Sequence, residues 1–123
     1  MRLLFVAPYY WPAFQFGGPV PANHGLVKAL ARKGVDVTVY TTNVGLDSKV
    51  PVNQEVMLDG ARVFYFSFAR FFERFAESGW QFSVPMSRAL CRSVGSFDVL
   101  HIAGIWGYPT AVAAHYARKR RVP

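Results

Sequence analysis

Cysteine is almost absent from this sequence, and a long apolar run is absent altogether. Cys91 is the one cysteine among 123 residues, so no disulfide can form within the chain, and no metal-ligand spacing surrounds it. A chain without disulfides is typical of a reducing compartment, which predicts a cytoplasmic protein. No stretch of about 18 apolar residues is available for a membrane-spanning helix. The short apolar stretch at the N-terminus lacks the cleavage site of a signal peptide, so none is expected.

Acidic residues are scarce as well. Seven of them stand against 14 basic residues, and the formal net charge is +7. A basic surface favours anionic partners, namely the phosphates of nucleotides and sugars, an anionic membrane, or nucleic acid. The densest basic run, residues 118–121, falls at the end of a predicted helix, where cations stabilise the negative end of the helix dipole. No nucleic-acid-binding module accompanies this run, so nucleic acid is not an expected partner.

Two nucleotide-binding motifs are also missing. The sequence has neither the Gly-x-Gly-x-x-Gly of dinucleotide-binding folds nor the Gly-Lys-Ser/Thr of a P-loop. The second predicted strand ends in Tyr-Thr-Thr-Asn at residues 40–43, without the acidic residue that binds a ribose 2′-hydroxyl. A dinucleotide-binding domain remains one alternative interpretation. A non-enzymatic domain that binds phosphate or a nucleotide, or that acts as a scaffold, remains another.

Core-forming residues are abundant. The sequence is 52% hydrophobic and 16% aromatic, which is enough for the core of a single domain over residues 1–123. Apolar and β-branched runs predict four strands, at residues 3–7, 35–42, 61–66 and 97–102. Apolar residues at helical spacing predict three helices, at residues 20–33, 84–94 and 108–121, with a loop at residues 43–60. Strands that alternate with helices predict an α/β fold, a Rossmann-like parallel sheet with helices on both faces.

The last two residues, Val122-Pro123, have the character of the entry into a further strand. A sheet that stopped here would leave a strand edge exposed to unwanted pairing. We therefore expect the chain to be a truncated piece of a longer protein. A complete four-stranded domain is the alternative.

The first strand and the loop after it carry the most informative pattern. Pro8 and Pro12 end the strand, and the loop closes with Gly17-Gly18 directly before a predicted helix. Glycine lets a ligand approach the backbone, and a helix N-terminus offers N–H groups and a partial positive charge to an anion. The pattern predicts an anion site at this glycine pair. A surface loop without a ligand is the alternative.

Three blocks of sequence carry a family resemblance. They are Leu-Phe-Val-Ala-Pro-Tyr-Tyr-Trp-Pro followed by Gly-Gly-Pro-Val (residues 4–12 and 17–20), the Leu-Val-Lys-Ala-Leu-Ala-Arg-Lys-Gly block with its following strand (26–42), and Phe-Asp-Val-Leu-His-Ile-Ala-Gly-Ile-Trp (97–106). In this order they resemble family-4-type glycosyltransferases of the GT-B fold. The resemblance implies the N-terminal, acceptor-side half of a nucleotide-sugar-dependent enzyme. Such an enzyme transfers a sugar, with retention of configuration, to a glycan, lipid-linked or small-molecule acceptor.

The resemblance also implies what lies outside these residues. In that family a C-terminal domain holds most of the nucleoside-diphosphate sugar, the donor substrate, and carries a Glu-x₇-Glu motif that this sequence lacks. A histidine important for catalysis in the family would fall beyond Pro123, so no catalytic residue is expected within the chain. We expect the chain to be inactive without the C-terminal domain of the same protein. Its substrates are a sugar nucleotide and an acceptor, and no cofactor or metal is required.

Some site residues follow from the resemblance. Gly17 and Gly18 match glycines whose backbone approaches the donor diphosphate and the acceptor. His101 and Trp106 match a strand-end motif at the rim of the cleft, with Ala103 in place of the second histidine of that motif. A histidine in an apolar strand is more typical of a satisfied core residue than of a catalytic group. Trp106 suits a stacking platform for a sugar ring and packing of the cleft wall equally.

Acceptor contacts are expected from two further segments. Tyr9, Tyr10 and Trp11 follow the first strand at its carboxyl end, where open α/β sheets bind their ligands. Simple packing is an equal alternative for these three side chains. Arg70 matches a basic acceptor contact that related enzymes carry after the third strand.

An aromatic stripe surrounds that arginine. The spacing i, i+3, i+4, i+7 predicts an amphipathic helix, with the stripe formed by Phe68, Phe71, Phe72 and Phe75. One interpretation is a helix that packs on the core. The other is peripheral contact with an anionic membrane, on its inner face, with Arg70, Arg74 and the basic run at residues 118–121 beside the phenylalanines. Glu73 and Glu77 oppose strong attraction to an anionic surface.

Overall fold

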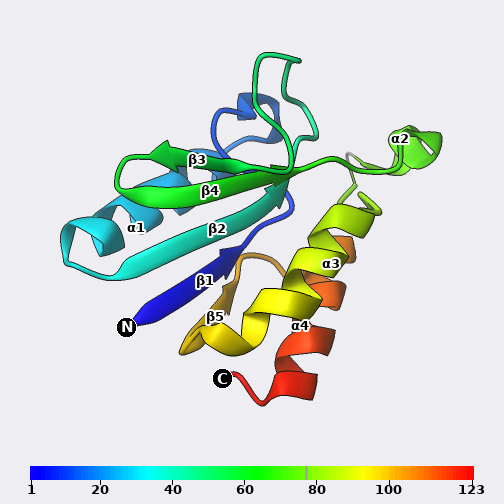
Figure 1. Cartoon of the computed structure of the whole chain (residues 1–123). Helices are drawn as coiled ribbons and strands as arrows, with labels where there is room; N and C mark the ends of the chain where they lie inside the picture. The colour runs from blue at the N-terminus through cyan, green and yellow to red at the C-terminus, as the bar shows by residue number, and fades with distance from the viewer. Residues whose placement is uncertain (77) are drawn as a thin grey trace.

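A five-stranded sheet forms the centre of the molecule (Figure 1). The computed structural model describes residues 1–76 and 78–123, and for residues 72 and 73 it describes the backbone only. The strands are β1 (Arg2–Val6), β2 (Asp36–Thr42), β3 (Glu55–Leu58), β4 (Ala61–Phe66) and β5 (Val99–Ile102). Their order in the sheet is β3-β4-β2-β1-β5. The pairs β1–β2, β1–β5 and β2–β4 are parallel, as the sequence predicts. The first strand therefore lies inside the sheet between two parallel neighbours.

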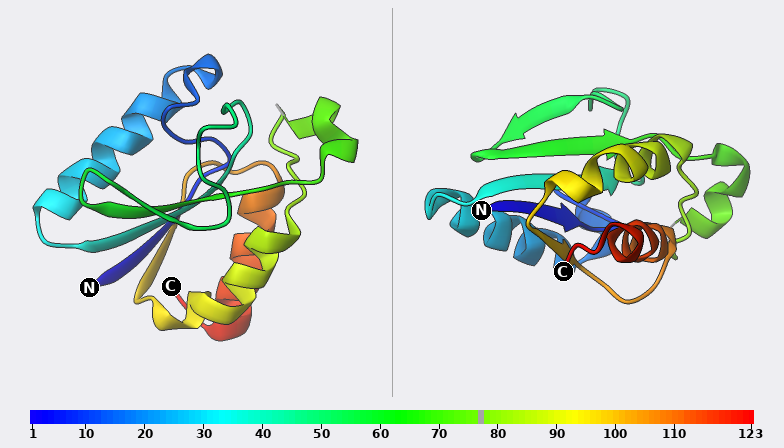
Figure 2. Two further views of the ribbon diagram at one scale, coloured as in Figure 1. Left: turned by 45° about the horizontal axis from the view of Figure 1, so that its top comes forward. Right: turned by 60° about the horizontal axis from the view of Figure 1, so that its bottom comes forward.

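Helices cover both faces of this sheet, which confirms the predicted α/β fold (Figure 2). They are α1 (Pro19–Arg32), the short α2 (Glu73–Ala76), α3 (Val84–Ser93) and α4 (Tyr108–Arg120), with 3₁₀ turns at Phe14–Phe16, Arg70–Phe72 and Val94–Ser96. Because side chains alternate along a strand, Leu3 and Phe5 of β1 join the core that contacts α1. Leu4 and Val6 join the opposite core, against α3 and α4. Burial on both faces explains why β1 is a continuous apolar run.

The predicted loop at residues 43–60 is wrong in one part. Residues 55–58 form β3, which pairs antiparallel with β4 through Leu58–Ala61 and Glu55–Phe64. The connecting turn is Asp59-Gly60, in which both residues have positive φ, 48° and 86°. Asp-Gly is a preferred sequence for such two-residue hairpin turns. The sheet is therefore mostly parallel, with one antiparallel edge strand.

The aromatic stripe does not form one helix on the core. A 3₁₀ turn and the four-residue α2 replace it, and the side chains of Phe71 and Phe75 are 90% and 44% exposed. The prediction of core packing is thus wrong for these two phenylalanines. The side chain of Phe72 and all of Glu77 lie outside the described residues. Figure 1 shows α2 standing away from the sheet.

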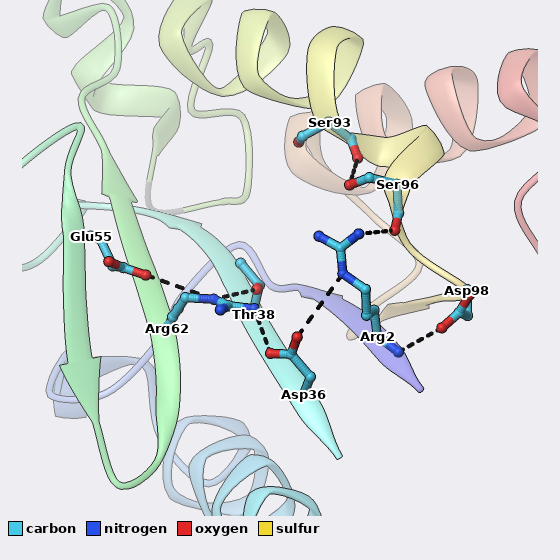
Figure 3. Close-up of polar contacts among 8 residues, drawn as sticks. All are labelled: Arg2, Asp36, Thr38, Glu55, Arg62, Ser93, Ser96 and Asp98. Carbon is cyan, nitrogen blue, oxygen red and sulfur yellow. Dashed lines mark hydrogen bonds and ion pairs between the residues drawn. The ribbon is translucent and has the colours of Figure 1, made fainter. Parts of the chain in front are cut away.

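A polar network lies at the end of the sheet where β1 and β2 begin (Figure 3). The backbone amide of Arg2 donates to the carboxylate of Asp98 at 2.7 Å. The guanidinium of Arg2 donates to the backbone carbonyl of Ser96, also at 2.7 Å. Arg62 forms ion pairs with Asp36 and, at 3.7 Å, with Glu55. Each of these exposed ion pairs contributes little stability. Together they pair the acidic side chains at this end of the sheet with basic ones.

The last residues return to the sheet. The amide of Leu100 in β5 donates to the carbonyl of Pro123 at 2.8 Å. Val122-Pro123 thus lies beside the free side of β5, the position that a further strand takes. Among the described residues, no helix combines the length and the apolar character that crossing a bilayer demands.

Candidate functional site

An open cleft lies at the carboxyl ends of β1 and β5, where open α/β sheets bind ligands. Its volume is about 470 Å³. One wall comes from the loop after β1 and the start of α1, and the other from the end of β5 and the residues after it. The lining residues are Pro8, Tyr9, Phe16, Pro19, Asn23 and residues 101–104.

The glycine pair stands at the start of α1. It is not among the lining residues itself, but Phe16 and Pro19, the residues before and after it in the chain, line the cleft. Gly17 has φ +81°, a conformation that favours glycine. Gly18, the N-cap of α1, has ordinary helical angles (φ −57°, ψ −35°), and a Cβ there meets nothing within 4 Å. The protein's own packing therefore does not demand glycine at position 18. Both glycines are exposed, so space for a ligand is a sufficient reason for the missing side chain.

The helix N-terminus offers fewer donors than the sequence pattern suggests. Pro19 and Pro21 have no N–H, while Val20 and Ala22 donate to the carbonyls of Gly17 and Gly18, both at 3.2 Å. Among the described residues, the Gly18 amide alone is left without a hydrogen-bond partner at this terminus. An anion here would meet that one donor and the positive end of the α1 dipole.

Aromatic rings form the walls of the cleft. Tyr9 stacks on Phe16 with ring centres 3.9 Å apart and planes inclined by 9°. His101 stacks on Phe5 at 4.7 Å and 17°, and its side chain is exposed. The interpretation of His101 as a buried core histidine is therefore wrong. It lies on the same face of the sheet as Phe5, but there the open cleft separates it from the start of α1. Tyr9 and His101 are the two sequence-predicted residues that the cleft brings together.

A second, smaller pocket of about 220 Å³ lies at the carboxyl ends of β2 and β4. Asn43 and Arg70 line it, and the side-chain oxygen of Asn43 is buried without a hydrogen-bond partner in the described part of the chain. The two pockets are neighbours on either side of the 3₁₀ turn Phe14–Phe16. Gln15 of this turn donates to the carbonyl of Gly45, which lines the second pocket, at 2.9 Å, and Phe16 lines the cleft. A Cβ at Gly45 would collide with Gln15 and Phe16. The sequence patterns do not single out Asn43 as a site residue, although its place directly after β2 is a usable signal.

A family model described as "Glycosyl transferase 4-like domain" matches residues 17–123. This chain belongs to that family. The match includes the glycine pair, the ends of β2 and β4 and all of β5, while β1 and the loop residues up to Phe16 precede it. No curated protein and no solved structure was found to match the chain.

The first loop of the glycosyltransferase domain is anchored from beneath by a polar network that sequence patterns do not reveal. The hydroxyl of Tyr10 lies 3.2 Å from Nδ1 of His24 in α1, and Nε2 of His24 lies 2.9 Å from the carboxylate of Asp59. Because that carboxylate only accepts, Nε2–H of His24 donates to it, and in the neutral imidazole this leaves Nδ1 to accept from the hydroxyl of Tyr10. Trp11 stacks on the same imidazole at 4.7 Å. Tyr10 is 1% exposed, so it supports the loop and does not line the cleft.

A second anchor holds the same loop of the transferase domain to the sheet. The hydroxyl of Tyr65 in β4 donates to the backbone carbonyl of Trp11. Burial raises the pKa of Tyr65 to about 12, and burial first, then Tyr65 and Asp59, raises the pKa of Tyr10 well above its usual value. Both phenols therefore stay protonated and remain donors at neutral pH. Trp11, like Tyr10, therefore holds the loop in position.

Trp106 of the glycosyltransferase domain lies outside both pockets. It is 66% exposed and meets Trp80 edge to face, with ring centres 5.8 Å apart. The neighbouring Gly107 and Gly79 bring their backbones into contact. Within the described residues, no three His, Cys, Asp or Glu side chains gather into a possible metal centre.

Proposed function

We propose that this domain is the acceptor-binding, N-terminal half of a retaining, nucleotide-sugar-dependent glycosyltransferase of the cytoplasm. The observation that carries the proposal is the open cleft beside the Gly18 amide at the start of α1, in a chain of the glycosyltransferase 4-like family. The proposal includes a C-terminal domain of the same protein that holds most of the donor. Without that domain, residues 1–123 bind no complete donor and transfer no sugar.

The donor diphosphate is placed against Gly18. Charge builds on the leaving nucleoside diphosphate as the bond to the anomeric carbon breaks. The Gly18 amide and the positive end of the α1 dipole stabilise that charge, and the donor-binding domain supplies the cations. In this proposal no metal takes part.

The acceptor reaches the anomeric carbon from the sheet side of the cleft. Tyr9 and His101 line that side and offer ring faces and polar edges to a sugar or polyol. The second pocket, with its unpaired Asn43 oxygen and its arginine, suits an acceptor that has a hydroxyl group and an anionic substituent. Asn43 accepts from the hydroxyl, and Arg70 pairs with the anion.

A pair of histidine variants tests this placement in the full-length enzyme. His101→Ala removes a ring that lines the cleft, and we expect kcat/KM for sugar transfer to fall about tenfold or more, the cost of one lost charge-assisted or polar contact. His115→Ala is the matched control, because His115 is also exposed but lies on α4 away from the cleft. We expect that variant to keep the parent activity.

Two results would contradict the proposal. One is equal activity of the His101 and His115 variants. The other is calorimetric binding of NAD, with no binding of a nucleoside-diphosphate sugar, by the full-length protein.

A further inference from the structure

Large apolar side chains gather on one end of the molecule without being buried. Of the eleven large hydrophobic side chains that are exposed among the described residues, six lie in residues 71–84 and 105–106. We name these six the apolar tip: Phe71, Phe75, Phe82, Val84, Ile105 and Trp106. Ile105 is 97% exposed and Phe71 is 90% exposed. Single exposed hydrophobic residues are ordinary, but a contiguous group of them marks an interaction surface.

The two segments of the apolar tip are joined into one surface. The amide of Tyr108 donates to the carbonyl of Gly79 at 2.8 Å, and the backbones of Gly79 and Gly107 touch. Trp80 links the segments further, with its ring 5.8 Å from Trp106 and 6.1 Å from Phe82. The exposed side chains therefore belong to one neighbourhood and not to two separate loops.

This surface projects outward. In both views of Figure 2, α2 and the chain that leads to α3 stand beyond the end of the sheet. Within the described chain, none of the six side chains of the apolar tip lines the cleft or the second pocket. Projecting apolar side chains suit insertion into a deformable surface. They do not suit the binding of a small molecule, which needs a concave pocket.

The charged residues around the apolar tip indicate which kind of partner this surface binds. Arg70 lies over the ring of Phe68 at 5.6 Å, and Arg74 lies over the ring of Phe75 at 4.8 Å. Arginine and aromatic side chains together are typical of proteins at the level of lipid headgroups. Glu73 and Glu77 balance these two arginines in the sequence, so attraction to an anionic surface comes from the net charge of +7 of the whole chain.

The basic run at residues 118–121 does not belong to this surface. It lies at the end of the 13-residue α4 that is remote from Tyr108, about 20 Å away at 1.5 Å per residue. It can contribute to long-range attraction, which salt screens beyond about 8 Å. The direct contact with the partner is therefore made by the apolar tip and not by the basic run.

We propose that the apolar tip inserts into the headgroup region of an anionic lipid bilayer, such as the inner face of a cell membrane. Insertion buries the exposed apolar area, while the exposed side chain of Arg74 extends to the lipid phosphates. The inference does not depend on sugar transfer. It places the carboxyl edge of the sheet, and with it both pockets, near the membrane surface.

Vesicle sedimentation of the full-length protein tests this inference. We expect binding to vesicles of phosphatidylcholine mixed with phosphatidylglycerol, and weaker binding to phosphatidylcholine alone. The double variant Phe75→Ser, Ile105→Ser should weaken binding to the mixed vesicles by about tenfold or more, because two apolar side chains no longer leave water. Both side chains are already exposed, so the variant should fold as the parent does, which circular dichroism checks.

Matched controls separate insertion from other causes of binding. Leu26→Ser and Met57→Ser change hydrophobic side chains that are 42% and 63% exposed elsewhere, and both should bind like the parent. Unchanged binding of the double variant overturns the inference, as does absence of binding by the parent. Loss of binding only when residues 118–121 are neutralised also overturns it. So does concentration-dependent dimerisation that the double variant abolishes, since a second copy would then be the partner.

Discussion

Replacing Gly18 by valine in the full-length enzyme should lower the turnover of sugar transfer by about a hundredfold or more, the scale of losing one donor to a developing oxyanion. The free energy of unfolding should change by no more than about 1 kcal/mol, because Gly18 has helical angles and its Cβ meets nothing within 4 Å. The side chain would instead occupy the space over the Gly18 amide. Steady-state kinetics and urea unfolding measure the two quantities.

Gly25→Val is the matched control for this variant. Gly25 lies in the same helix and is exposed, and a Cβ there would meet nothing within 4 Å, so valine at this position should leave turnover unchanged. Loss of activity at position 18 alone assigns the effect to the cleft. Parent-like sugar transfer by Gly18→Val means that the donor does not approach this backbone.

The largest effect on stability is expected at Gly107. We expect Gly107→Ala to lower the free energy of unfolding by about 3 kcal/mol or more, which is the range of severe backbone strain and overpacking. Gly107 has φ +109°, and its Cβ would collide with the carbonyl group of Gly79 and lie 3.1 Å from the Gly79 Cα. The same carbonyl accepts the hydrogen bond from Tyr108 that starts α4, so the clash falls on backbone that cannot move aside.

Gly104→Ala separates the clash from the strain. Gly104 has nearly the same φ, +114°, but a Cβ there meets nothing within 4 Å. This variant should lose only about 1–2 kcal/mol, the cost of the unfavourable φ. Equal losses for the two variants in denaturant unfolding would show that the contact between residues 79 and 107 does not hold these segments together.

Local patterns predict most of the fold. The burial of β1 on both faces is visible in its apolar run. Gly34 directly follows the predicted helix at residues 20–33, where a residue with positive φ commonly ends a helix, and its φ is +88°. Helical spacing over residues 84–94 also predicts an inward face of four residues. Met86, Leu90 and Val94 are buried as predicted, and Cys91 is only partly buried. These features depend on residues close together in the chain, where periodicity and backbone preference act directly.

The missed features depend on contacts that the sequence does not display. Asp59 serves both the hairpin turn and the His24 network, and only the folded chain brings it within 2.9 Å of that imidazole. The helical spacing of the phenylalanines predicts a packed helix, but the helix is only four residues long, and Phe71 and Phe75 are exposed. The site follows the same rule. Tyr9 and His101 could be placed at the carboxyl edge, whereas the inward direction of Tyr10 could not.

Hydrogen exchange at the Gly18 amide tests the central claim most directly. Adding a nucleoside diphosphate to the full-length enzyme should slow exchange of this amide, followed by NMR, because its N–H gains a phosphate oxygen as acceptor. Amides at the opposite edge of the sheet, such as that of Arg2, should exchange at unchanged rates. Unaltered exchange at Gly18 in protein saturated with the nucleotide would contradict the account.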